Sequence, residues 1–130
     1  MVKKADIIEL ELPFKAEYVS VARLAVSGIA NRIGFDIEII EDIKVAVAEV
    51  CNKIVGAGSK YADCYRLIFA IYEGNLDVTF DCEDKSLKCI FDMDNDELAV
   101  PIINALMDSV DFCPENNYLL SISKILEENI

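Results

Sequence analysis

The residues that most constrain what this chain can fold into are 36–55, DIEIIEDIKVAVAEVCNKIV. Their apolar side chains recur at steps of three and four residues, which is the spacing of one buried helical face. Asp36 precedes this run and is a candidate N-cap, and acidic side chains fill the first turns, where the helix dipole favours negative charge. The predicted helix buries Ile40, Ile43, Val47, Val50 and Ile54 and ends at Gly56 and Gly58.

Length and composition predict one domain with one hydrophobic core over residues 1–130. The chain is 54% hydrophobic, which excludes a disordered protein. No apolar run approaches the roughly 20 residues that a membrane-spanning helix needs. The first residues, MVKKADIIELEL, lack the continuous apolar segment of a signal peptide. We therefore expect a cytoplasmic protein that makes no membrane contact.

The net charge of −12 limits the possible partners. It argues against nucleic acid, because phosphate neutralisation needs clustered Lys and Arg. Two interpretations remain open: the charge attracts a basic protein partner, or it keeps a small protein soluble.

The cysteine and histidine contents exclude several kinds of site. An odd number of cysteines, with no CxxC pair and no secretion signal, argues against disulfides. The chain has no His, which excludes Ser-His-Asp triads and histidine-containing zinc sites. We expect most of the cysteines to be small core residues. They are Cys51, Cys64, Cys82, Cys89 and Cys113.

The chain before the long helix predicts a strand and another helix. Ile8, Leu10 and Leu12 alternate with glutamates, which is typical of a half-buried strand. Residues 16–33 follow as a helix that ends at Gly34, and the short link to the next helix favours an antiparallel pair. The buried stripe of this helix is Val19, Ala22, Val26, Ile29 and Ile33.

After Gly58 the apolar period becomes that of strands. Residues 65–73 predict one strand, Gly74-Asn75 predicts a tight turn, and residues 76–81 predict a second strand. The order predicts an α+β fold, a two-layer α/β sandwich whose mixed, mostly antiparallel sheet is covered on one face by three helices. The remaining elements are a segment 87–91 that extends the sheet or lies across it, an acidic connector 92–97, a helix 100–109, and a hairpin of 110–113 and 118–124 around a turn at 114–117.

Two stretches of the sequence resemble a known family. The run ELPFKAEYVSVARLAVSGIANRIGFDIEIIEDIKVAVAEVC is similar to the start of the anti-sigma-factor serine/threonine kinases of the RsbW type, in the GHKL ATPase superfamily, and INALMDSVDF is similar to their last helix and following strand. The resemblance implies the histidine-kinase-like ATPase fold. It also implies a cytoplasmic dimer that holds a sigma factor and phosphorylates a Ser of an anti-anti-sigma factor with ATP and magnesium.

The family's first ATP-site motif, Glu-Ala-Cys-Thr-Asn-Ala-Val, falls on residues 49–55 of the long helix. The resemblance places on Glu49 the base that activates the attacking hydroxyl. The Asn that holds magnesium falls on Lys53, and an ammonium cannot ligate a cation. Asn52 is one position away and points about 100° around the helix.

The other two motifs also depart from the family. The Asp that reads the adenine amino group falls on Cys82, a poor acceptor, and the Gly two positions later falls on Asp84, whose charge would face an anionic ligand. The Gly-x-Gly that cradles phosphates falls on Glu97 and Ala99. The ATP lid is shortened to residues 88–96. These degenerate positions predict that no nucleotide binds; if the family activity is retained, the cofactors are ATP and magnesium.

Glu49 has two interpretations. It is the remnant of a catalytic base, or it forms an i, i+4 salt bridge with Lys53, in the favourable orientation for such a pair. A further hypothesis is that Lys53 replaces the charge of the missing metal and holds Glu49 in an empty site.

The acidic run DMDNDE, residues 92–97, resembles part of a calcium-binding loop. The Gly expected at its sixth position is Glu97, and the Glu expected at its twelfth is Ile103. We therefore expect a solvated acidic loop and no metal site.

Three functions stay open. The first is a binding protein that keeps the anti-sigma-factor scaffold and has lost nucleotide binding and kinase activity. The second is an active ATP-dependent serine/threonine kinase that binds a sigma factor and phosphorylates an anti-anti-sigma factor. The third is a protein that regulates a relative by forming mixed dimers. A homodimer is expected through the free edge of the first strand. Arg23, Asn31 and Arg32 either contact a partner or form the solvent-exposed face of their helix.

Overall fold

The computed structural model describes residues 5–91, 99–111 and 118–126, and it confirms the α+β class. The strands are β1 Asp6–Pro13, β2 Cys64–Tyr72, β3 Asn75–Asp81, β4 Ser109–Asp111 and β5 Leu120–Ile125. The helices are α1 Val19–Ile33, α2 Ile37–Ala57 and α3 Ala99–Leu106, and η1 Ala16–Tyr18 and η2 Lys85–Phe91 are 3-10 helices.

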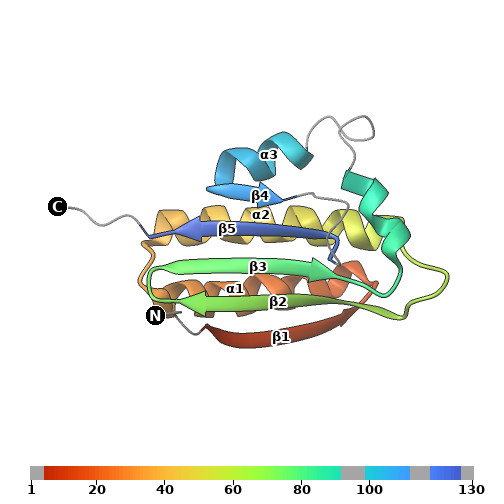
Figure 1. Cartoon of the computed structure of the whole chain (residues 1–130), viewed down its shortest axis with the longest axis horizontal. Helices are drawn as coiled ribbons and strands as arrows, with labels where there is room; N and C mark the ends of the chain where they lie inside the picture. The colour runs from red at the N-terminus through yellow and green to blue at the C-terminus, as the bar shows by residue number, and fades with distance from the viewer. Residues whose placement is uncertain (1–4, 92–98, 112–117, 127–130) are drawn as a thin grey trace.

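The sheet has the order β1-β2-β3-β5-β4, and every described strand pair is antiparallel, so the expected mixed sheet is antiparallel throughout this part of the chain. Figure 1 shows α1 and α2 side by side behind the sheet, with α3 beyond β4. α3 packs against α2 and β4. No described helix lies in front of the sheet, so none of the described helices covers its second face. Within the same residues, no helix is both long and apolar enough to cross a membrane.

The long helix forms as predicted. Asp36 caps α2, because its Oδ1 accepts a hydrogen bond from the Ile39 N–H at 2.9 Å. The helix continues through Gly56 and ends at Gly58, whose positive φ of 65° suits a glycine. All five predicted core residues of α2 are buried, together with Ala46 and Cys51.

The core lies between the sheet and the buried sides of α1 and α2. Strands β2 and β3 supply its largest side chains, and cross-strand neighbours such as Phe69 and Val78 are fully buried. All residues of the stripe predicted on α1 are buried except Ile33, which is half-buried, and Ala30 is buried with them. The inner side chains of the two strands are Tyr65, Leu67, Phe69, Leu76, Val78 and Phe80.

Three local predictions needed correction near the first strand and the first hairpin. Residues 16–18 form the separate 3-10 helix η1, a common start for a helix. Ile8 is 45% exposed, because β1 is an edge strand with a neighbour on one side only. The hairpin turn is Glu73-Gly74, since Asn75 already pairs with Tyr72 and Gly74 supplies the positive φ of 77°.

Two predictions after β3 also differ from the structure. Residues 87–91 do not extend the sheet; they belong to η2, which packs against α2 and buries Leu87. The last helix ends at Leu106 instead of residue 109, because Lys124 Nζ donates to the Leu106 carbonyl at 2.7 Å and the Ile125 N–H donates to Asp108 at 2.6 Å. The connector 92–97 and the turn 114–117 lie outside the described residues.

Candidate functional site

The structure brings together the segments that carry the predicted ATP-site positions. Helix α2 packs against both η2 and α3, so these two segments lie against the same long helix. Glu97 lies outside the described residues. The five described positions are Glu49 and Lys53 on α2, Cys82 and Asp84 between β3 and η2, and Ala99 at the first position of α3.

Glu49 and Lys53 are both half-buried and lie about one helical turn apart. The predicted salt bridge between them is wrong: the ion pairs among the described residues do not include this one. A helical i, i+4 pair is worth only about 0.2–0.5 kcal/mol, too little to hold two long side chains against other contacts. The role of Glu49 as a base stays a prediction.

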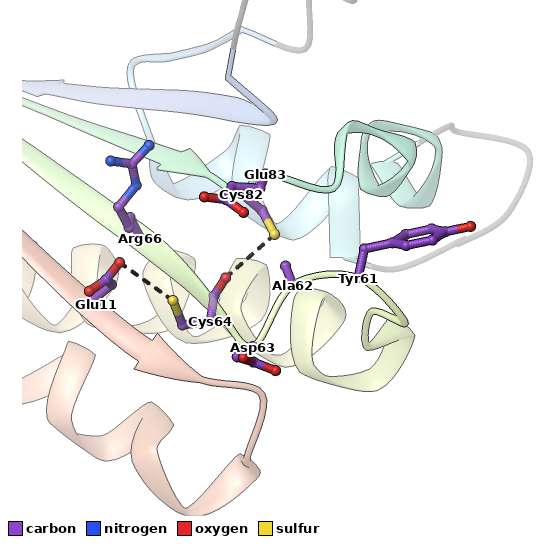
Figure 2. A pocket seen from close by; sticks show the side chains of 8 residues that line it. All are labelled: Glu11, Tyr61, Ala62, Asp63, Cys64, Arg66, Cys82 and Glu83. Atoms are coloured by element: carbon purple, nitrogen blue, oxygen red, sulfur yellow. Dashed lines mark hydrogen bonds between the residues drawn. The ribbon is translucent and has the colours of Figure 1, made fainter.

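Cys82 is 2% exposed and turns its thiol toward the neighbouring strand. Its Sγ donates a hydrogen bond to the Cys64 carbonyl at 3.5 Å, which Figure 2 shows. Burial raises the pKa of the Cys82 thiol, so the group stays protonated at neutral pH. A neutral donor committed to a main-chain oxygen does not offer the acceptor that an adenine amino group needs.

Asp84 holds an ordered negative charge where the resemblance expects a glycine. Its carboxylate accepts hydrogen bonds from Ser59 Oγ at 2.7 Å, from Ser86 Oγ at 2.6 Å and from the Ser86 N–H at 3.1 Å. The hydrogen bonds from Ser86 and Ser59 hold the pKa of Asp84 below its ordinary value. The carboxylate therefore joins the loop after α2 to the start of η2 and stays ionised there.

The third motif position is apolar. Ala99 is buried at the first position of α3. Leu87 of η2 is buried in the hydrophobic core, and both η2 and α3 pack against α2. The described part of this region therefore presents methyl groups where the resemblance expects bare glycine backbone.

Two cavities lie at the end of the sheet where Cys82 and Asp84 are found. The first, drawn in Figure 2, has a volume of about 310 Å³, and carboxylates dominate its charged lining. The second has a volume of about 460 Å³ and is lined by Ser59, Asp84 and Ser86 among others. Glu49 and Lys53 line neither cavity. The first cavity is lined by Glu11, Tyr61, Ala62, Asp63, Cys64, Arg66, Cys82 and Glu83.

The three cysteine thiols that the structure describes offer no activated nucleophile. Cys51, Cys64 and Cys82 are free, and Cys51 is buried in the core, where desolvation raises its pKa to about 12. Desolvation also raises the pKa of Cys64, whose Sγ donates to Glu11 at 3.4 Å. A thiolate is the nucleophilic form, so these three side chains are inert near neutral pH. Among the described residues, no group of three His, Cys, Asp or Glu side chains is placed to hold a metal ion.

Sequence reasoning missed the two serines that hold Asp84. Ser86 follows Asp84 by two residues, and an Asp that accepts from the backbone two residues on is a known turn pattern, so this partner was predictable. Ser59 lies 25 residues before Asp84, and no local pattern announces that contact.

Comparison with known proteins identifies the family. Residues 12–121 match the family described as Histidine kinase-like ATPase domain. The chain is 33% identical to a protein named Serine-protein kinase RsbW from Halalkalibacterium halodurans, over 98% of this chain and 88% of the relative. It is 29% identical to proteins of the same name from Bacillus thuringiensis and Bacillus anthracis, over 98% of this chain and 89% of each relative.

The alignment with the Halalkalibacterium protein also contains gaps in this chain. The comparison with the Halalkalibacterium protein extends over 143 positions, more than the 130 residues of this chain, so the relative has residues without a counterpart here. A shorter chain is what the expected shortening of the ATP lid would produce. The match over most of the chain and the near-complete coverage of the relatives place this protein in the histidine kinase-like ATPase family, as a member of the RsbW type.

Proposed function

We propose that this protein is an anti-sigma-factor-like regulatory protein that acts by binding other proteins and has lost nucleotide binding and kinase activity. The observation that carries the proposal is the carboxylate of Asp84, held in place by Ser59 and Ser86. An anion fixed at this position repels the phosphates of a nucleotide. The Cys82 thiol, which donates to the Cys64 carbonyl, supports the same conclusion for the adenine.

Several unfavourable changes add up in this region. Each hydrogen bond or charge contact that is lost costs on the order of 1–3 kcal/mol. Each 1.4 kcal/mol weakens binding about tenfold. Changes at Lys53, Cys82 and Asp84 together would move a micromolar site to millimolar affinity or weaker. We assign no chemical step to ATP or magnesium in this chain, because the residues present do not suit them.

The second candidate is an active ATP-dependent serine/threonine kinase that binds a sigma factor and phosphorylates an anti-anti-sigma factor. It is favoured by the name serine-protein kinase that the relatives carry, and by Glu49, which remains where the family's base is expected. In this case ATP and magnesium would be held by residues other than those at the three motif positions.

Calorimetric titration with magnesium–ATP and magnesium–ADP separates the two functions. We expect a dissociation constant for either nucleotide above about 1 mM, which corresponds to a binding free energy weaker than about 4 kcal/mol. The triple variant Lys53→Asn, Cys82→Asp, Asp84→Gly is the matched control, because it restores the first two motifs, three of the five changed positions, and is expected to bind more tightly. Micromolar binding to the unaltered chain would overturn the proposal.

We further propose that the protein is a cytoplasmic homodimer of one domain with a short lid, and that α1 contacts its partner, a sigma factor or an anti-anti-sigma factor. Helix α1 exposes Arg23 beside Leu24, which is 72% exposed. Co-purification from the native cell with Arg23→Glu is expected to lose the partner, whereas Lys60→Glu, a matched charge reversal in an exposed loop, should retain it. Recovery of a related chain with the bait would favour mixed dimers instead.

A further inference from the structure

The larger of the two cavities at the end of the sheet lies between the end of α2 and the segment that leads into η2. Residues 57–61 line one side of it, and Asp84 and Ser86 line the other. None of these residues belongs to a strand, so the cavity does not depend on either face of the sheet. We call it the loop cavity; its volume is about 460 Å³.

Ser59 fixes the shape of the loop that lines this cavity. Its Oγ accepts hydrogen bonds from the Tyr61 N–H at 3.1 Å and from the Ala62 N–H at 3.0 Å, and it donates to Asp84 Oδ2 at 2.7 Å. Ala62 is buried next to Tyr61 and anchors the same loop. The backbone around Tyr61 is therefore ordered without any packing of the Tyr61 ring.

The Tyr61 side chain itself is 85% exposed. Figure 2 shows its ring pointing away from the ends of the strands. Tyrosine is enriched among the residues that contribute most to protein–protein binding. Because the loop is already ordered, Tyr61 loses little entropy when a partner covers it. The face of its ring also attracts cations.

Asp84 places a negative charge in the same cavity. Its carboxylate accepts three hydrogen bonds, one from Ser59 and two from Ser86. An ionised carboxylate has about four acceptor positions, so one stays open to a donor from outside. The ion pairs among the described residues include neither Asp84 nor Lys60, the basic side chain of the lining.

We propose that the loop cavity receives a Lys or Arg side chain of a partner protein, with the cation against the Asp84 carboxylate and the side chain's stem across the Tyr61 ring. The carboxylate that repels phosphates attracts a cation for the same reason, and the aromatic ring adds to that attraction. Lys60 competes for the carboxylate and weakens the contact. This docking site rests on the protein-binding part of the proposed function.

The test uses the whole chain, labelled with 15N, and two short alanine peptides. One peptide has a central Arg, and the other has citrulline, the neutral analogue of Arg, in its place. We expect the Arg peptide to shift the amide signals of residues 57–62 and 84–86 and to saturate at millimolar concentration. The citrulline peptide should bind about two- to fivefold more weakly, because it lacks the charge that Asp84 attracts.

Three variants test the parts of the site, and the spectrum of each reports whether it is folded. Asp84→Asn should bind the Arg peptide about two- to fivefold more weakly, and Tyr61→Ala should weaken it by a similar factor. Lys60→Gln removes the competing cation and should strengthen binding up to about twofold. The control Glu38→Gln removes one exposed charge near the start of α2, about one helix length away, and should leave the affinity unchanged.

Several results would overturn the docking site. These are no saturable shift at millimolar peptide, shifts that map elsewhere, equal affinity for the Arg and citrulline peptides, or equal weakening by Asp84→Asn and Glu38→Gln. Concentration-dependent shifts at residues 57–62 without peptide would assign the loop to a second copy of the chain instead. A native partner that co-purifies equally with Asp84→Asn would remove this site and leave the proposed function intact.

Discussion

Strand β3 presents two chemically opposite faces from seven residues. Toward the helices, Leu76, Val78 and Phe80 are fully buried in the core. On the face turned away from α1 and α2, Asp77, Thr79 and Asp81 alternate with them at the same spacing. The inner side chains are fixed by close packing, where one methylene matters. The outer ones carry charge without disturbing the fold, because they lie outside the close-packed core.

The largest effect should come from the inner face. Phe80→Ala should reduce the free energy of unfolding by about 3–5 kcal/mol, because it leaves a cavity in a fully buried position. Urea denaturation monitored by circular dichroism measures it. A loss below about 1 kcal/mol would mean that the two faces are not as different as their burial indicates.

A smaller effect should come from the charged end of the outer face. Asp81→Asn weakens the contacts to Arg66 and Lys85 and should lower the free energy of unfolding by about 1–2 kcal/mol. The loss is no larger because both cations are partly exposed to solvent. The same denaturation experiment at low and high salt checks it, and the difference should shrink with salt. Asp63→Asn serves as the control in an exposed loop, and an equal loss there would assign the effect to net charge.

The hydroxyl pair on the outer face should matter less. Thr79 Oγ1 and Ser121 Oγ lie 3.2 Å apart across β3 and β5. Thr79→Val should cost about 0.5–1 kcal/mol. Adding Ser121→Ala should cost little more, because both partners are then removed, and a double-mutant cycle measures this coupling. Strictly additive losses would show that the two hydroxyls do not interact.

The smallest effect should have the opposite sign. Burial raises the pKa of Asp77 above its ordinary value, so the folded protein binds this proton more tightly than the unfolded chain. Ionised Asp77 therefore costs stability at neutral pH, and that cost disappears as the pH falls through the raised pKa and below about 3.9. Asp77→Asn should stabilise the protein by about 0.5 kcal/mol or less at pH 7 and not at all near pH 3. A destabilised variant at pH 7 would reveal a favourable contact for the Asp77 charge within the chain.

The strongest periodic signals in the sequence predicted the fold. The 3–4 spacing of Ile43, Val47 and Val50 located α2, and the alternation of Val78 and Phe80 located β3. The segment 87–91 stayed ambiguous because five residues with mixed apolar side chains fit a short strand or a helical turn equally well. The sequence did contain a sign of the turn that precedes η2. Asp84 accepts a hydrogen bond from the backbone N–H of Ser86, two residues later, which is a common turn pattern of Asp.

The site was only partly predictable for a different reason. Sequence similarity aligned Cys82 and Asp84 with the family's motif, but what their side chains do depends on Cys64 and Ser59, which are 18 and 25 residues away. Contacts across such distances follow from strand register and loop closure, which a single sequence does not specify. The Glu49–Lys53 salt bridge failed for a related reason, because spacing along a helix allows a contact without requiring it.

The place of β5 in the sheet has a consequence for how the protein is made. Leu120–Ile125 enters between β3 and β4, although both of those strands leave the ribosome earlier. Until these residues emerge, β3 has an unpaired edge and β4 has no described neighbour, and unpaired edges invite association with other chains. The sheet is therefore completed late. Its last pairing joins residues that are distant in the sequence, such as Val78 of β3 and Ile122 of β5. Folding should accordingly be limited by this last insertion and should be slower than the short hairpin of β2 and β3 alone would suggest.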